Sequence, residues 1–447
     1  RWVGKWHLTF SDLVNPGTNS DYYSTISYNK DTGLEDPYLE HIYLAQNVLK
    51  PFGYDGWVGP EPFGPYAWNM GSTAKDQAKG RDPVYARYAV QNLQKFEQSG
   101  ERFHLTVAFN DPHDIVAYGD IGVRLPRLDF TIDPSVPDVP LPPTYNEDLS
   151  TKPSCQMSYK QAQDYLFQPI SDLATYLKVY YSLIKAYDSH IYEIMTYLKQ
   201  SSLHNNTIVI VTSDHGEFLS SHGGLHEKWY AAYDEALKVP FMIYNPILFN
   251  GYKTCDDLTS HIDLLPTVLG LAGLDIVKLR KKLNKKFTTA VMPVGRKINI
   301  PFDNPSAINY CPDTSRQNEP VFFYITDDPS RGSTTVNAAL SAATGTTVTF
   351  PLVSKPNGIK GIVTNYNGKK YKYCVYFDVT GAVSTLEYEM YNLTDDPTEV
   401  TNLCYSGNST PATEAIKAEL QSRLDAQVAQ KLLSPIVYNN YPPAGAS

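Results

Sequence analysis

A long amphipathic helix that runs directly into a β-branched strand most constrains the fold of this chain. Apolar residues recur three and four positions apart over residues 173–198, the period of a helix with one buried face. Residues 207–212 (TIVIVT) then read as a strand buried on both faces, as in a parallel sheet. A helix beginning at Asp82, a cap residue, and a strand over 103–109 repeat the pattern. Alternating helices and buried strands predict a doubly wound α/β sheet, with ligands beyond the carboxyl ends of its strands.

Polar residues follow both strands at those carboxyl ends. Asp214 and His215 come directly after the second strand, where a carboxylate and an imidazole can share a divalent cation. An isolated aspartate and histidine next to each other more often cap a helix or form local hydrogen bonds. This pair is followed within fourteen positions by His222, His226 and Lys228 on a glycine-rich loop. A flexible cationic loop beside a metal is suited to binding a tetrahedral oxyanion ester.

The whole chain divides into three parts by its composition and predicted elements. Residues 1–275 form the α/β region, residues 276–300 are basic and read as a linker or exposed helix, and residues 301–447 form a smaller domain. Asn367-Gly368 between two β-like runs signals an antiparallel hairpin in that domain, which ends in a helix. The full prediction is a large, mostly parallel sheet flanked by helices, with a C-terminal antiparallel sheet plus helix.

Charge and cysteine usage limit the partners and the compartment. The net charge of −9 argues against a protein that binds nucleic acid through its overall charge. No apolar run approaches the ~20 residues of a membrane span. Five cysteines lack zinc-site spacing. Sequons at Asn205, Asn392 and Asn408 favour a secreted glycoprotein, in an extracellular, periplasmic or lumenal compartment. The sequence begins at Arg1 with neither a Met nor a leader, which indicates a position inside a larger protein.

Five segments, in order, resemble the blocks of one family, the sulfatases of the alkaline phosphatase superfamily. The longest runs from Ser213 to Lys228 and continues through residues 233–241; the others are shorter signatures on either side of it. These are Gly4-Lys5-Trp6-His7-Leu8, Asp111-Pro112-His113, His261-Ile262-Asp263-Leu264-Leu265-Pro266-Thr267 and Tyr391-Asn392-Leu393-Thr394-Asp395-Asp396-Pro397.

The resemblance implies a role for each matching residue. Asp214 would ligate the cation and His215 would take the neighbouring ligand position. The expected metal is Ca²⁺, although the imidazole leaves Mg²⁺ or Mn²⁺ open. Lys5 and Lys228 would neutralise the sulfate oxygens, His7 would orient or deprotonate the nucleophile, and His113 would serve the leaving group. His222 and His226 would either contact substrate or pack the loop.

The nucleophile is the point of departure from the family. Sulfatases oxidise the Cys or Ser of a [CS]-x-P-x-R motif to formylglycine, upstream of the segment matched here by Gly4 to Leu8, and an Asp-Asp pair also precedes that segment. The sequence contains no such motif, and Cys311-Pro312 has its proline one place too early. Asp327-Asp328 follows a strand-like run as the family's pair does, but agrees better with a C-terminal β segment. We therefore expect the nucleophile on a residue outside this chain.

These observations predict a sulfuric ester hydrolase that uses a metal and formylglycine. Its substrate would be a sulfated small molecule or glycan, and its own missing N-terminal fragment is a further expected partner. The first alternative is a phosphodiester or phosphonate monoester hydrolase of the same superfamily, favoured by His215. The second is an inactive sulfatase-like protein with a binding or structural role, since fold does not establish activity.

Overall fold

The computed structural model places the described residues in two compact units. The first holds those within 1–141 and 165–207, and the second those within 142–164 and 208–432. Cys311 and Leu8 lie outside the described residues. The structure describes residues 1–7, 14–15, 20–21, 27–29, 32–59, 70–71, 80–118, 130, 132–166, 170, 172–286, 292–298, 300, 303, 319–328 and 352–432.

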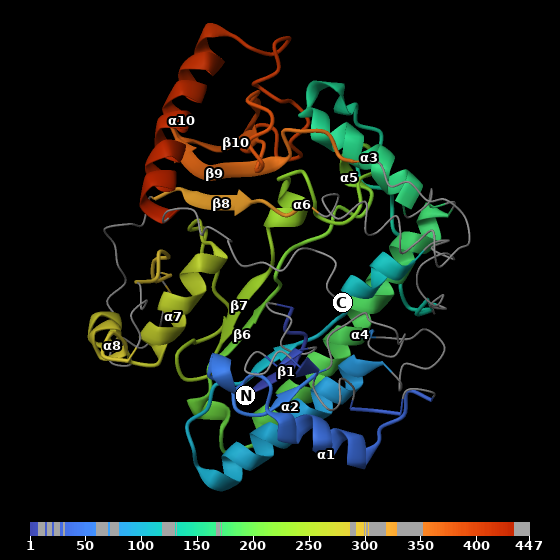
Figure 1. The fold of residues 1–447 in the computed structure, drawn as a ribbon, viewed down its shortest axis with the longest axis vertical. Helices are drawn as coiled ribbons and strands as arrows, with labels where there is room; N and C mark the ends of the chain where they lie inside the picture. Colours follow the sequence, from blue (N-terminus) through green and yellow to red (C-terminus); the bar gives the residue numbers. More distant parts are fainter. Residues whose placement is uncertain are drawn as a thin grey trace. The chain divides into compact units, whose positions relative to one another are not determined.

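The first unit is built on a short parallel sheet of three strands. Strand β1 (Trp2–Gly4) lies between β4 (Trp57–Val58) and β5 (Thr106–Ala108), with Val3 opposite both Val58 and Val107. Helix α2 (Arg81–Ser99) packs on this sheet, and α4 (Leu173–Gln200) packs along α2 (Figure 1). The parallel sheet and both predicted helices are confirmed here. Smaller elements are β2 (Val14–Asn15), β3 (Ser20–Asp21), α1 (Pro37–Gln46), η1 (Lys50–Phe52), η4 (His113–Ala117) and η6 (His204–Asn206).

The start of α2 differs from its predicted start at Asp82. The N-cap is Gly80, and Asp82 lies inside the first turn with its side chain fully buried. Its carboxylate accepts the backbone N–H of Asn110 at 2.8 Å and of Asp111 at 2.9 Å. Asp82 therefore stabilises the segment that follows β5 and does not cap its own helix.

The second unit corrects the prediction for residues 207–212. Strand β6 (Val209–Thr212) pairs antiparallel with β7 (Phe241–Tyr244), with Val209 opposite Tyr244 and Thr212 opposite Phe241. The chain between them turns back and brings β7 alongside β6 in the opposite direction. The apolar run predicted a strand, which is confirmed. A run of this kind carries no information on the direction of the neighbouring strand.

A four-stranded antiparallel sheet with a C-terminal helix completes the second unit, as predicted. Its order is β11-β10-β9-β8, with α10 packed on β9 and β10 (Figure 1). The predicted hairpin turn at Asn367 and Gly368 is confirmed, with φ of 49° and 75°. The strands are β8 (Val321–Ile325), β9 (Gly358–Tyr366), β10 (Lys369–Phe377) and β11 (Glu387–Asn392), and α10 spans Pro411–Lys431.

The second unit also contains several shorter helices, which lie between its strands and loops. Helix α8 (Ile276–Leu283) falls within the predicted basic linker and buries none of its residues, while the boundaries 1–275, 276–300 and 301–447 stay a prediction. In the part of the chain that is described, no helix is long and apolar enough to cross a membrane. These elements are η5 (Leu149–Thr151), α3 (Ser154–Leu166), α5 (Ser221–Gly224), α6 (Asp234–Leu237), η7 (His261–Asp263), α7 (Leu264–Leu271) and α8 (Ile276–Leu283).

Candidate active site

The Asp214–His215 pair stands at the end of β6 with two donor atoms side by side. His215 Nδ1 lies 2.8 Å from the carbonyl oxygen of Gly216. A carbonyl oxygen only accepts, so Nδ1 carries the proton, and Nε2 presents its lone pair when the imidazole is neutral. That Nε2 is 3.6 Å from Asp214 Oδ2. A side chain oxygen and a basic nitrogen are thus presented together at one strand end.

This donor set fits part of a cation shell. One carboxylate oxygen and one imidazole nitrogen suit a borderline divalent ion, and the Gly216 carbonyl fixes the ring tautomer as partners of metal-bound histidines do. Two donors alone do not complete a shell. Among the described residues no group of three or more His, Cys, Asp or Glu side chains surrounds a common point. Asp214 and His215 accordingly stay predicted ligands.

Lys228 lies on the same loop, with its side chain 22% exposed. Its Nζ is 3.8 Å from Glu227 Oε2 and 5.3 Å from the ring centre of Trp229. Glu217 accepts the backbone N–H of Glu227 at 2.5 Å. Burial, and then the charge of Glu227, raise the pKa of Glu217 to about 8. The protonated form of Glu217 is therefore favoured near neutral pH.

Two aspartates after β8 hold the residues that follow Lys228. The indole N–H of Trp229 donates to Asp327 Oδ2 at 3.0 Å, and the hydroxyl of Tyr230 donates to Asp328 Oδ1 at 2.7 Å. Asn357 also donates to Asp328, at 3.1 Å. Both aspartates thus have hydrogen-bonding partners on or next to this loop, in agreement with the prediction that this pair belongs to a C-terminal β segment.

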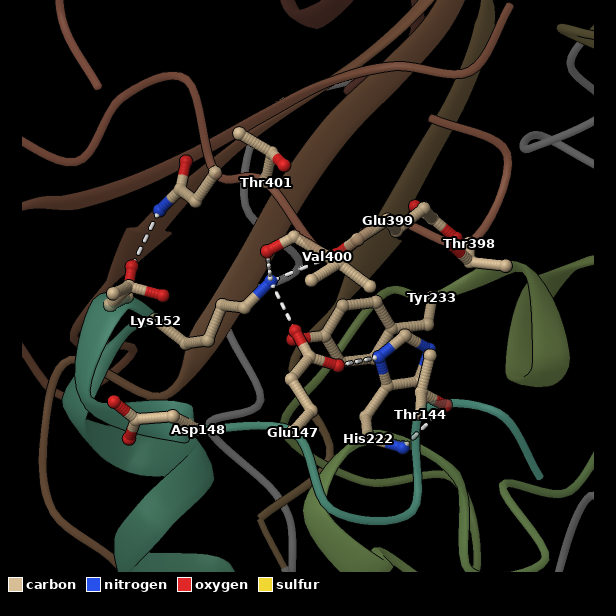
Figure 2. A network of polar contacts seen from close by, with 12 residues as sticks. Thr144, Glu147, Asp148, Lys152, His222, Tyr233, Thr398, Glu399, Val400 and Thr401 are labelled. Carbon is tan, nitrogen blue, oxygen red and sulfur yellow. Dashed lines mark hydrogen bonds and ion pairs between the residues drawn. The ribbon is translucent and has the colours of Figure 1, made fainter. Parts of the chain in front are cut away.

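His222 is fully buried, and one of its ring nitrogens faces the carboxylate of Glu147 (Figure 2). Nδ1 is 2.7 Å from Glu147 and Nε2 is 3.1 Å from Glu235. These two hydrogen bonds raise the pKa of His222 to about 9 against the opposing effect of burial. The contacts favour the loop-packing interpretation, and substrate binding by His222 stays a prediction without structural support.

His226 lies on the same loop and is partly buried. Its backbone N–H donates to Gln163, and its carbonyl accepts the hydroxyl of Tyr159. Burial, with a smaller contribution from the charge of Lys160, lowers the pKa of His226 to about 3, so its imidazole is neutral at physiological pH. These surroundings also favour packing over substrate binding, for which His226 stays a prediction.

Lys5, His7 and His113 belong to the first unit, at the ends of adjacent parallel strands. The backbone N–H of Lys5 donates to the carbonyl of Ala108 at 3.0 Å. A side chain on Gly4 would lie 2.0 Å from that oxygen, so glycine is required where β1 passes β5. His113 begins η4, in the turn held by Asp82. The pairing of β1 with β5 therefore brings the backbone of Lys5 next to the start of the His113 turn.

Several residues that shape these loops gave no signal in the sequence. Asp82 looked like a helix cap, and nothing in the sequence connects Glu147, Lys152 or Glu235 with His222. The contact between Glu147 and His222 joins residues 75 positions apart. Only the high frequency of acidic residues around the glycine-rich loop hinted at charge pairing.

The comparisons with known proteins agree with the motifs. The Sulfatase family model matches residues 1–274, so this chain belongs to the sulfatase family. Iduronate 2-sulfatase of Mus musculus is 28% identical over 302 residues, covering 60% of this chain and 52% of that protein. The uncharacterised sulfatase YidJ of Escherichia coli K12 is 29% identical over 286 residues, covering 61% and 50%. The chain thus spans about half the length of these relatives.

Solved structures show the same fold at low identity. A protein in complex with its substrate D-glucosamine-2-N,6-O-disulfate superposes with a TM-score of 0.51 at 16% identity, over 78% of this chain and 70% of that one. The phosphonate monoester hydrolase of Agrobacterium radiobacter gives 0.50 at 18% identity, over 81% and 63%. The fold is therefore that of the alkaline phosphatase-like hydrolases.

Proposed function

We propose that this protein hydrolyses sulfate esters, with Asp214 and His215 as ligands of a divalent cation. The observation that carries the proposal is the placement of His215 Nε2 3.6 Å from Asp214 Oδ2, directly after a strand in a sulfatase-family chain. The cation would be Ca²⁺ or, because one ligand is nitrogen, Mn²⁺ or Mg²⁺. When bound, it would polarise the ester oxygens.

Each remaining residue of the proposed site has a task set by the chemistry. A sulfate ester moves negative charge onto its leaving oxygen as the bond breaks, so the site must supply positive charge and a proton. Lys228 and Lys5 would neutralise the sulfate oxygens. His113 would donate a proton to the leaving oxygen, and His7 would orient the nucleophile. The nucleophile would be a formylglycine outside these 447 residues, which contain no [CS]-x-P-x-R motif.

The proposed substrate class is a sulfated glycan or a sulfated small molecule. Relatives named iduronate 2-sulfatase and endo-4-O-sulfatase support the glycan, as does a neighbour crystallised with a disulfated glucosamine. Such substrates fit an extracellular, periplasmic or lumenal location, which we also propose. Turnover of phosphodiesters or phosphonate monoesters is the second candidate, favoured by the imidazole ligand and by the phosphonate hydrolase of the same fold.

The test uses the natural protein that contains this chain. We expect stoichiometric divalent metal by elemental analysis and turnover of an aryl sulfate. Asp214→Ala should lose both, because it removes a charged ligand, whereas Asp256→Ala, a substitution of an exposed carboxylate, should keep both. A faster reaction with an aryl phosphodiester would favour the second candidate. Metal-free wild-type protein without turnover of either ester would leave the binding or structural role.

A further inference from the structure

The loop that separates Asp214–His215 from Lys228 is held in an unfavourable backbone conformation. Leu219, Ser220 and His222 have φ of 47°, 72° and 49°, in the left-handed region that side chains with a Cβ disfavour. Gly223 and Gly224 continue the turn with φ of 71° and 82°. Such a turn persists only when the surrounding contacts fix it.

The side chain of His222 makes the contacts that fix this turn. Both nitrogens lie against carboxylates, Nδ1 at 2.7 Å from Glu147 and Nε2 at 3.1 Å from Glu235. Since a carboxylate accepts, both nitrogens must donate, which only the imidazolium can do. The ring stacks on Tyr233 at 3.5 Å with an interplanar angle of 5°. Thr144 anchors the backbone, because its hydroxyl accepts the N–H of His222 at 3.0 Å.

Glu147 is itself fixed from behind by a second buried cation. Lys152 Nζ is 2.7 Å from Glu147 Oε1, and it donates at 2.8 Å to the carbonyl oxygens of both Glu399 and Val400 (Figure 2). The Glu147 carboxylate is thus shared between Lys152 and His222. Its position is set by the segment that follows β11, and not by the mobile end of a surface side chain.

Glu235 links the same imidazolium to the segment that carries the candidate metal ligands. A side chain on Gly216 would lie 1.9 Å from the carbonyl oxygen of Glu235, so the two backbones are in close contact. The N–H of Gly216 donates to the carbonyl of Ala236 at 2.8 Å. His222 therefore connects the loop to the residues packed directly against the Asp214–His215 segment.

We propose that His222 is a positioning residue that, as an imidazolium between Glu147 and Glu235, fixes the turn joining Asp214–His215 to Lys228 without contacting substrate. The inference rests on the proposed function of those three residues. It assigns to the two glutamates a role that no motif indicated. It selects loop packing over substrate contact, the two roles that the sequence left open for His222.

The direct test measures the protonation of His222 and needs no turnover. Histidine-selective ¹⁵N NMR of the natural protein, with His222 assigned from His222→Gln, should show two protonated nitrogens at pH 7.5. The midpoint of deprotonation should move to lower pH in Glu235→Gln, which removes one charged acceptor, and stay in place in Glu193→Gln, an exposed control. A neutral tautomer at pH 7.5, or an unmoved midpoint in Glu235→Gln, would overturn the proposal.

The second test separates positioning from substrate contact. For an aryl sulfate, we expect His222→Gln to lower kcat by about 100-fold, the effect of displacing a reacting group by about 1 Å, with little change in KM. Glu235→Gln should shift the alkaline limb of kcat/KM to lower pH, and circular dichroism checks the fold of both variants. A rise in KM alone would assign His222 to substrate binding, and unchanged kinetics would exclude both roles. Wild-type protein without turnover would refute the proposed function. The NMR measurement would still test the protonation of His222, because it needs no turnover.

Discussion

The turn that leads to His113 and the loop between His215 and Lys228 are fixed in opposite ways. In the first unit a single buried carboxylate, Asp82, accepts two backbone N–H groups after β5. In the second unit the loop after β6 is held through a side chain, His222, placed between two carboxylates. A carboxylate that accepts backbone N–H groups does not depend on the side chains of the turn, because nearly every residue carries such a group. A charge pair fixes a loop only while both partners stay ionised, and a carboxylate accepts hydrogen bonds more strongly when it is ionised, so both anchors depend on pH.

The pH ranges of the two anchors complement each other. Burial raises the pKa of Asp82 to about 7, so its carboxylate is the stronger acceptor above that pH. The hydrogen bonds to Glu147 and Glu235 raise the pKa of His222 to about 9, so the imidazolium persists below that pH. Both anchors are in their ionised forms between about pH 7 and 9. We expect the proposed activity to have its optimum in that interval.

The largest expected effect compares the glycines at the two strand ends. Gly4→Ala should lower the free energy of unfolding by about 5 kcal/mol, because a φ of +94° and a backbone oxygen at 2.0 Å both oppose a Cβ. Gly216→Ala meets an oxygen at 1.9 Å without the positive φ, and should cost less. Denaturant unfolding measures both. Equal losses would mean that the backbone conformation of Gly4 adds nothing.

Removing the carboxylate anchor should have the next largest effect. Asp82→Ala leaves two buried N–H groups without an acceptor, at about 2 kcal/mol each, so we expect a loss of about 4 kcal/mol. Asp82→Asn keeps one acceptor oxygen and should lose about half of that. The free energy of unfolding, measured for both variants at pH 7, tests this order. An alanine variant as stable as the asparagine variant would show that the two hydrogen bonds do not anchor the turn.

The imidazolium anchor predicts a pH dependence of stability. The folded-state pKa of His222 lies above its ordinary value of 6.5, so its stabilisation is complete below pH 6.5 and disappears as the pH rises through about 9. The shift corresponds to about 3 kcal/mol. Wild-type protein should lose this amount between pH 6.5 and 10, relative to His222→Gln measured over the same range. Parallel pH profiles of the two proteins would contradict the assignment.

The smallest expected effect concerns the tether of the Lys228 loop to the residues after β8. Trp229→Phe removes one part-exposed hydrogen bond to Asp327 and should cost about 1 kcal/mol. Tyr230→Phe removes the bond to Asp328 at a more buried position and should cost somewhat more. Thermal unfolding of the two variants provides the comparison. The opposite order would indicate that Asp327 is the main tether.

Local sequence patterns predicted much of the fold and the location of the candidate site. The helices α2 and α4, the hairpin at Asn367 and the placement of Asp214 after a strand all follow from periodicity and turn chemistry. The direction of β6 was predicted wrongly. The apolar run predicted a strand buried on both faces, but Val209 to Val211 are only half-buried and Thr212 is exposed, and the pairing partner is decided by the route of the loop that follows.

The sequence by itself determined which residues follow each strand, because secondary structure and turn chemistry depend on neighbours within a few positions. It thereby placed Asp214, His215 and Lys228 on one loop and His113 on another. Only the tertiary structure decided what holds those loops. Asp82 reaches Asn110 across 28 positions, and Glu147 reaches His222 across 75. Contacts over such separations depend on how the units fold, and a buried charge finds its partner only once packing has excluded water around it.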